Sequence, residues 1–437
     1  MIWALCAMPK PTKTDLELIV WGATGFTGRL VAEHLARTQD AHRARWALAG
    51  RDRDKLEQIR GSLASLHPSC AELPILLGDA RDAASLDALV ARTRVILTAV
   101  GPYSRYGSAL VAACARSGTD YCDLTGEVHW MRKMIDAHHA EARESGARIV
   151  HTCGFDSIPS DLGVLMLQEH MREQHGSRCD RVRLYVTKMR GGFSGGTVAS
   201  ALQTMDDVQA DPSLRQVLGD PHALDPEPGR SRPEEKDQLG VRYNEELGQW
   251  TGAFLMSAVN TRVVRRSNAL LGHPWGRDFL YSEVSAYGPG PRGLLTAGIV
   301  TAGLGSFLVL SSVPVLRRQL ERRVLPAPGE GPSAEERERG HFEMKLVGEG
   351  TSARTGRPVT LTGKVSSSGD PGYAATARML SEAALCLAFD DLPAEGGVLT
   401  PATSMGMRLV ERLRRGGMTF EVEERTASPL WSLGDRR

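Results

Sequence analysis

The first third of the chain alternates short apolar runs with segments whose apolar residues recur at helical spacing. The apolar runs lie at 17–22, 45–50, 74–78, 94–100, 120–124 and 148–153. Segments with a period near 3.6 residues separate them and predict helices, for example over 26–37, 52–66 and 130–145. Strands that are apolar throughout and are joined by helices imply a parallel sheet covered on both faces. The pattern therefore predicts an α/β fold with a Rossmann-type doubly wound parallel sheet.

The pattern changes after the sixth apolar run. Residues 181–189 alternate like a half-exposed strand, and the sequence RGGFSGG and a helical run from Thr197 follow. Alternation over 341–349 and 358–366 predicts a β-hairpin, and 373–389 has the pattern of an amphipathic helix. This part of the chain therefore predicts an α+β arrangement.

One apolar segment is long enough to cross a membrane. Residues 294–316 carry no charge, and four arginines follow closely at 317, 318, 322 and 323. Several glycines and Pro314 dilute the hydropathy of the segment. Three interpretations stay open: a buried pair of core helices, a hairpin that lies on a membrane surface, and a true membrane span.

Composition narrows the functional classes. The net charge of the 437-residue chain is +1 and aromatic residues make up 5%, so the chain lacks the overall field and the stacking side chains of many nucleic-acid binders. Seven widely spaced cysteines without a CxxC motif favour reduced thiols over a disulfide framework or a zinc site. The apolar amino terminus lacks the basic region of a signal peptide. We expect a cytoplasmic protein without a nucleic-acid partner or a metal site.

The first apolar run ends in GATGFTG and a helical pattern follows. At such a junction the first glycine permits a tight turn, the second lets the backbone approach a pyrophosphate, and the third lets the helix pack closely. The amides at the start of the helix then face the anion. We predict that the dinucleotide phosphates lie against Gly22, Ala23, Thr24, Gly25, Phe26, Thr27 and Gly28.

The end of the second strand distinguishes NADP from NAD. NAD sites usually carry an acid there, which holds the ribose 2′-hydroxyl. Here the sequence is AGRDRDKL, with Arg51 at the tip and Lys55 close behind. A guanidinium suits a 2′-phosphate because it forms paired, charge-assisted hydrogen bonds. Asp52, the competing acid, is expected to cap the next helix, so the sequence favours NADP.

Polar loops follow the fourth, fifth and sixth strands, where ligands of such sheets bind. The fourth strand ends in VGPYSRYG, in which Gly101 and Pro102 allow close approach to the cofactor and Tyr103 and Tyr106 overhang the crevice. The fifth ends in DLTGE and the sixth in CGFDSIPSD. Tyr103, Tyr106 and Asp156 are the candidates for direct chemistry. The alternative is that Asp156 or Ser157 caps the next helix.

A rival motif is GFSGG, which fits the nucleophile elbow GxSxG at Ser194 and lies between a strand and a helix. Because the stretch is so rich in glycine, a flexible loop over the crevice is the simpler interpretation. The sequence therefore favours an oxidoreductase over a hydrolase.

Taken together, GATGFTGRLVAEHL, AGRDRDKL, VGPYSRYG, DYCDLTGE and CGFDSIPSD resemble the saccharopine dehydrogenase-like oxidoreductases. The later stretches MRGGFSGGT, PAPGEGPSAEERERG, GDPGYAATARMLSEAALCLA and GGVLTPATSMG are similar to one branch, the trans-acting enoyl reductases of actinobacterial polyketide lipid biosynthesis. The resemblance implies an NADP-binding Rossmann domain over 14–160 and an inserted substrate domain over 161–370. It also implies a late helix and strand over 371–426 that return toward the first domain.

The resemblance implies an NADPH-dependent enzyme that reduces the C=C bond of an enoyl thioester or a related lipid or polyketide intermediate. Such a reaction needs a donor to the developing enolate and a proton for the α-carbon. Tyr103 and Tyr106 are the donor candidates, ahead of His151. A carrier protein for the acyl substrate, peripheral membrane contact and a homodimer stay open as partners. The alternative functions are a saccharopine dehydrogenase-like enzyme for C–N bonds and a membrane-peripheral NADPH-binding protein without catalysis.

Overall fold

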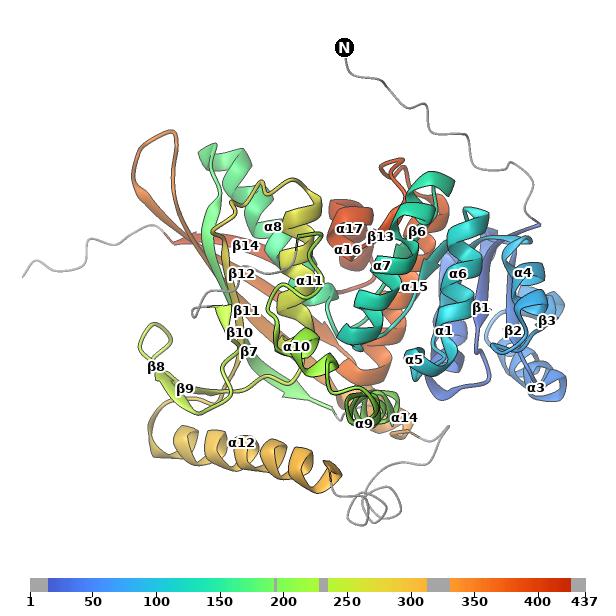
Figure 1. Ribbon diagram of the computed structural model, residues 1–437, viewed down its shortest axis with the longest axis horizontal. Helices are drawn as coiled ribbons and strands as arrows, with labels where there is room; N and C mark the ends of the chain where they lie inside the picture. Colours follow the sequence, from blue (N-terminus) through green and yellow to red (C-terminus); the bar gives the residue numbers. More distant parts are fainter. Residues whose placement is uncertain (1–14, 192–194, 228–234, 313–330, 426–437) are drawn as a thin grey trace, which may run out of the picture.

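The computed structural model describes residues 15–191, 195–227, 235–312 and 331–425. Two seven-stranded sheets organise this part of the chain, and Figure 1 shows them at opposite ends of the molecule with helices between them. Each sheet combines strands from early and late in the sequence.

The first sheet is parallel throughout and has the order β13-β6-β5-β4-β1-β2-β3. Its strands are β1 (Leu16–Trp21), β2 (Trp46–Gly50), β3 (Ile75–Leu77), β4 (Thr93–Thr98), β5 (Asp120–Cys122), β6 (Arg148–Val150) and β13 (Gly397–Leu399). The order from β3 to β6 is that of the dinucleotide-binding Rossmann fold. The predicted Rossmann-type sheet is therefore confirmed.

Helices cover both faces of this sheet, which explains its continuously apolar strands. Contacts link α1 to α15 and α15 to β1 and β4, while α6 contacts both α4 and α7. The helices are α1 (Phe26–Arg37), α2 (Gln39–Arg43), α3 (Arg53–Ala64), η1 (Pro68–Glu72), α4 (Ala83–Val90), α6 (Ser108–Ser117), α7 (Val128–Ser145) and α15 (Thr376–Phe389).

The second sheet has the order β14-β12-β11-β7-β10-β9-β8, and β7 and β10 form its one described parallel pair. Helices α8 (Ile158–His175) and α11 (Ser257–Leu270) pack on it. The strands are β7 (Cys179–Arg190), β8 (Arg242–Asn244), β9 (Gln249–Gly252), β10 (Leu280–Ala286), β11 (His341–Thr351), β12 (Pro358–Ser368) and β14 (Thr419–Arg425). The predicted hairpin is the β11–β12 pair.

The last part of the chain is divided between the two sheets. After α15, strand β13 pairs with β6 in the first sheet. Helices α16 (Pro401–Ser404) and α17 (Gly406–Arg415) follow, and β14 then pairs with β12 in the second sheet. Domain bounds near residues 160 and 370 stay a prediction.

The long apolar segment begins as one helix, α12 (Gly290–Ser312), which lies on the outside of the molecule below β9 in Figure 1. Ala297 is buried against β9, where a Cβ on Gly252 would lie 3.0 Å from Thr301 Oγ1. In contrast, Leu295 is 65% exposed and Ile299 64% exposed. The interpretation as a buried pair of core helices is therefore wrong for the described part of this segment. Residues 313–316 and the four arginines lie outside the described residues.

Candidate active site

The glycine loop between β1 and α1 has the geometry of a phosphate cradle. Gly22 has φ +84°, and a Cβ there would lie 2.3 Å from Val100 Cγ2. A Cβ on Gly28 would lie 2.2 Å from the Gly22 carbonyl oxygen. The tight turn and the close helix packing therefore require glycine at both positions.

The start of α1 is open to an anion. No side chain caps the helix at Gly25, and its first turn contains no acid. Because the first amides of a helix have no partner within it, and because the helix dipole is positive at this end, the loop fits a dinucleotide pyrophosphate. Thr27 faces the main pocket, whereas the Phe26 ring packs edge-on against Tyr373 with ring centres 4.8 Å apart.

Asp52 takes the helix-capping role that was expected for it, and the contact of Arg51 with a 2′-phosphate stays a prediction. Asp52 caps α3 by accepting a hydrogen bond from the Lys55 amide at 3.1 Å, and the Lys55 Nζ lies 3.4 Å from the same carboxylate. Arg51 is exposed just beyond β2 and forms no ion pair with a described residue. Arg51 is therefore the cation that remains available for a 2′-phosphate.

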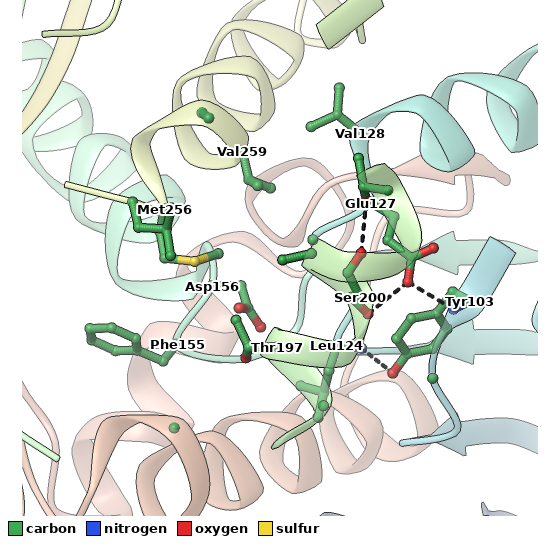
Figure 2. A pocket seen from close by; sticks show the side chains of 18 of the residues that line it. Tyr103, Leu124, Glu127, Val128, Phe155, Asp156, Thr197, Ser200, Met256 and Val259 are labelled. Atoms are coloured by element: carbon green, nitrogen blue, oxygen red, sulfur yellow. Dashed lines mark hydrogen bonds between the residues drawn. The ribbon is translucent and has the colours of Figure 1, made fainter. Parts of the chain in front are cut away.

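A cavity of about 620 Å³ begins at the carboxyl ends of β4, β5 and β6 and extends between the two sheets. Figure 2 shows it from close by. Helices α9 (Gly195–Ala210) and α10 (Leu214–Gly219), the start of α11 and the turn η3 (Pro371–Ala375) complete its wall. Most lining side chains are apolar, among them Leu124, Phe155, Met189, Met205, Val208, Leu218, Phe254, Met256 and Val259.

Glu127 is a buried anchor in the wall of this cavity. Its carboxylate accepts hydrogen bonds from the Tyr103 and Ser104 amides, both at 2.8 Å, and from Ser200 Oγ at 2.7 Å. The dashed lines in Figure 2 mark the bonds to Tyr103 and Ser200. Glu127 thereby fixes the start of α5 (Tyr103–Tyr106) and ties α9 to the first domain. Three donors hold this carboxylate, which favours a structural role for Glu127.

The two tyrosines of α5 differ in position. Tyr103 lines the cavity, and its hydroxyl accepts a hydrogen bond from the Leu124 amide at 3.2 Å and donates to the Thr98 carbonyl at 3.4 Å. Burial raises the pKa of Tyr103 well above its usual value, so the hydroxyl keeps its proton. Tyr106 is not among the described lining residues, because its ring packs 6.0 Å from the Arg81 guanidinium instead.

Asp156 is an acid inside the cavity. It follows β6, and its carboxylate lies against Gly154, where a Cβ would be 3.3 Å from Oδ2. Burial raises its pKa to about 7, and the nearby Asp123 carboxylate adds to this rise. Its carboxylate forms no hydrogen bond with the side chain of another described residue. Asp156 can therefore be protonated near neutral pH.

The alternative role of Asp156 as a helix cap does not apply. Ser157 occupies the N-cap position of α8, and its hydroxyl donates to Asn260 Oδ1 at 2.9 Å. His151, the reserve donor, lies outside the lining of the main cavity, and its Nδ1 is 2.8 Å from Asp123 Oδ2.

Gly101 lines the cavity, and a Cβ there would lie 3.5 Å from the Tyr103 ring. Pro102 forms the N-cap of α5 next to it, through a cis peptide bond. Ser194 of the rival motif lies outside the described residues. Within the described ranges, no group of three His, Cys, Asp or Glu residues is arranged to hold a metal.

The sequence did not point to the contribution of α9 and α10. Ser200 on α9 and Arg215 on α10 reach the cavity from a part of the chain that carries no recognised motif, whereas Thr197 ends the stretch MRGGFSGGT. The glycine-rich stretch before α9 was the one signal of a segment near the crevice.

Comparisons with known proteins bear on these features. Residues 18–150 match the family described as the saccharopine dehydrogenase NADP binding domain. A Mycobacterium tuberculosis protein named trans-acting enoyl reductase is 40% identical over 94% of this chain and 98% of its own length. The Mycobacterium leprae protein of the same name is 39% identical with the same coverage. The structure of apo saccharopine dehydrogenase (L-Glu forming) from Saccharomyces cerevisiae is similar in fold, with a TM-score of 0.54 and 13% identity over 94% of this chain and 99% of that one.

Proposed function

Because the chain belongs to the trans-acting enoyl reductases, we propose that it reduces the C=C bond of an enoyl thioester with NADPH. The NADP-binding domain over residues 18–150 identifies NADP as the cofactor. The observation that carries the proposal is the apolar cavity that begins at the carboxyl ends of this domain's strands and contains an acid with a pKa of about 7. An unsaturated acyl chain suits the apolar walls, and the reaction needs an acid.

Each reactive group of the cavity has a separate role in the proposed reduction. NADPH, when bound, supplies the hydride for the β-carbon. Asp156 holds a proton at its carboxyl group for the α-carbon. Tyr103 keeps its hydroxyl near the ends of β4 and β5, where the proton is donated to the Thr98 carbonyl over a long 3.4 Å bond. We assign to this proton the stabilisation of charge on the thioester oxygen, which requires that it turns from the Thr98 carbonyl to the substrate. The apolar side chains exclude water and thereby strengthen these interactions.

The cavity disfavours the alternative reaction at a C–N bond. A substrate such as an amino-dicarboxylate would need cations opposite its carboxylates. Among the described lining residues, Arg215 is the one cation, and it lies on α10 rather than at the strand ends. The cavity therefore fits a neutral thioester better than a dianion at the reaction centre.

The test is NADPH oxidation by the purified protein, followed by its absorbance, on addition of a crotonyl or longer enoyl thioester. We expect oxidation with the thioester and none with the saccharopine precursors glutamate and 2-aminoadipate 6-semialdehyde. Oxidation with the second pair alone would support the C–N alternative. Tight NADPH binding without oxidation of either kind would support a protein without catalysis.

We further infer that the enzyme works in the cytoplasm at a membrane surface. Helix α12 supports the contact with lipid, because in the described part of the chain it is the one helix long and apolar enough to span a bilayer and most of it is exposed. Free thiols suit the cytoplasm: the six cysteines within the described ranges, all buried, form no disulfide. We also infer that a carrier protein is the partner that presents the thioester.

A further inference from the structure

The lining of the cavity includes residues along almost the whole length of α9. The lining residues of this helix are Gly196, Thr197, Ser200, Ala201, Thr204, Met205, Val208 and Gln209. Pairs of neighbours that recur every four residues form one continuous stripe on a helix. At 1.5 Å per residue, the stripe from position 196 to 209 extends about 20 Å.

The two ends of this stripe differ in chemistry. Near Thr197 the cavity contains Asp156 and Gly101, where the reaction is placed. Figure 2 shows Thr197 and Asp156 in the same part of the cavity. At the other end, α9 stops at Ala210 and α10 begins at Leu214, so Arg215 stands at the outer end of the stripe. The described lining between the two ends is uncharged apart from Glu127.

Arg215 is available to a ligand. Its side chain is exposed, and it forms no ion pair with a described residue. The other two charged lining residues differ from it: Glu127 is engaged by three donors, and Asp156 lies at the reaction end. A substrate that fills the cavity would therefore meet a single cation, and it would meet it far from the reacting carbon.

We propose that Arg215 binds the phosphate of a phosphopantetheine arm, so that the site accepts an enoyl group on that arm; this rests on the proposed enoyl reduction. The length of this arm matches that of the stripe on α9. About sixteen bonds join the phosphorus to the thioester β-carbon, which is about 19 Å at roughly 3.6 Å per three extended bonds. A guanidinium binds phosphate through paired, charge-assisted hydrogen bonds. Arg215 is thus a specificity-determining residue at the mouth of the site.

The test compares two substrates that differ by one phosphate: enoyl-pantetheine and enoyl-phosphopantetheine. In the wild-type enzyme we expect a kcat/KM about tenfold or more higher for the phosphorylated substrate. Arg215→Ala should remove this advantage, so that kcat/KM becomes equal for the two substrates, whereas Arg215→Lys should keep part of it. Gln216→Ala is the matched control, because Gln216 is the exposed neighbour on α10 and does not line the cavity.

Two results would overturn the inference while enoyl reduction stands. One is equal kcat/KM for both substrates in the wild type. The other is an equal loss for both in Arg215→Ala, which would indicate damage to α10. Absence of NADPH oxidation with either substrate in the wild type would instead refute the proposed function and the inference together. Enoyl-coenzyme A and an enoyl carrier protein both contain this phosphate, so Arg215→Ala should lower kcat/KM for both substrates. In the wild-type enzyme, the substrate with the higher kcat/KM identifies whether coenzyme A or a carrier protein supplies the arm.

Discussion

Asp156 shows how the position of one residue gives a common side chain an uncommon property. The carboxyl group follows a buried strand, lies against Gly154 and has no cation beside it. Burial disfavours its charged form and raises its pKa to about 7. The site therefore holds a proton where the substrate is expected, at a pH at which an exposed aspartate would have lost it.

This property predicts a pH dependence. The donor form of Asp156 disappears as pH rises through about 7, so kcat/KM for an enoyl thioester should be level at lower pH and fall above that value. Asp156→Asn should lower turnover by about 10²- to 10⁴-fold and leave the Kd of NADPH unchanged. Tyr103→Phe, measured in parallel, should lower turnover but keep the fall above pH 7. The assignment fails if Asp156→Asn shows the wild-type pH profile.

We expect Arg51 to distinguish NADPH from NADH. Loss of a charge-assisted contact to the 2′-phosphate costs about 1.5–3 kcal/mol, so Arg51→Ala should weaken NADPH binding by about 10- to 150-fold and leave NADH binding unchanged. Fluorescence titration with each dinucleotide measures this. Arg53→Ala is the control, because Arg53 pairs with Glu57 along α3 at 3.9 Å. Equal weakening for both dinucleotides would contradict the role of Arg51.

At the residue scale, local sequence patterns predicted the glycine loop and the Asp52 cap, because both depend on a strand, a turn and a helix that are adjacent in sequence. They did not predict the anchoring role of Glu127 or the position of Arg215 at the mouth of the cavity. Ser200, which ties Glu127 to α9, lies 73 residues further along the chain, and Arg215 belongs to a helix without a motif. Such contacts depend on tertiary packing.

Helix α12 is the element whose surface is least like that of a soluble globular protein. Its exposed apolar residues include Leu294, Leu295, Ile299, Val300, Val309 and Leu310. At 100° per residue, positions 294 to 310 place exposed side chains over about 240° of the helix circumference. A second helix would cover a narrow stripe of this surface, whereas a bilayer interface would cover all of it. This breadth favours lipid over a second copy of the chain.

We therefore expect the protein to float with phospholipid vesicles in a density gradient. Leu295→Glu combined with Ile299→Glu should lower vesicle binding at least about tenfold, because two buried leucine-sized groups would be replaced by charges. Activity on a short, water-soluble enoyl thioester should not change. Leu66→Glu, at an exposed apolar residue of the first domain, is the control. A wild-type protein that stays unbound, or a dimer that the double variant dissociates, would contradict lipid contact.

At the element scale, periodicity predicted the strands and helices of the first sheet, the β11–β12 hairpin and the helix α15. Periodicity did not predict strand β13, because three residues are too few to show an alternation of apolar and polar positions. These residues form a strand because they pair with β6, about 250 residues earlier in the chain. Periodicity also did not predict the exposure of α12, since a long apolar run is equally consistent with burial in protein and with contact with lipid.

The whole molecule places a dinucleotide-binding sheet and a second sheet on either side of one elongated apolar cavity. The chain contributes to the wall of this cavity from α1 to α15, so the site exists only when both sheets have formed. The late segment stabilises this arrangement, because α15 packs on the first sheet while β14 pairs with the second. Sequence patterns predicted the two kinds of sheet, but not that one cavity would join them.

The central claim is that hydride passes from NADPH to an enoyl thioester within this cavity. The most direct measurement is mass spectrometry of the product formed with NADPH deuterated at C4, using the 4R and 4S forms separately. We predict a saturated thioester with one deuterium on its β-carbon from one of the two forms. Recovery of unreacted enoyl thioester from both forms, or a saturated product without deuterium on that carbon, would contradict the claim.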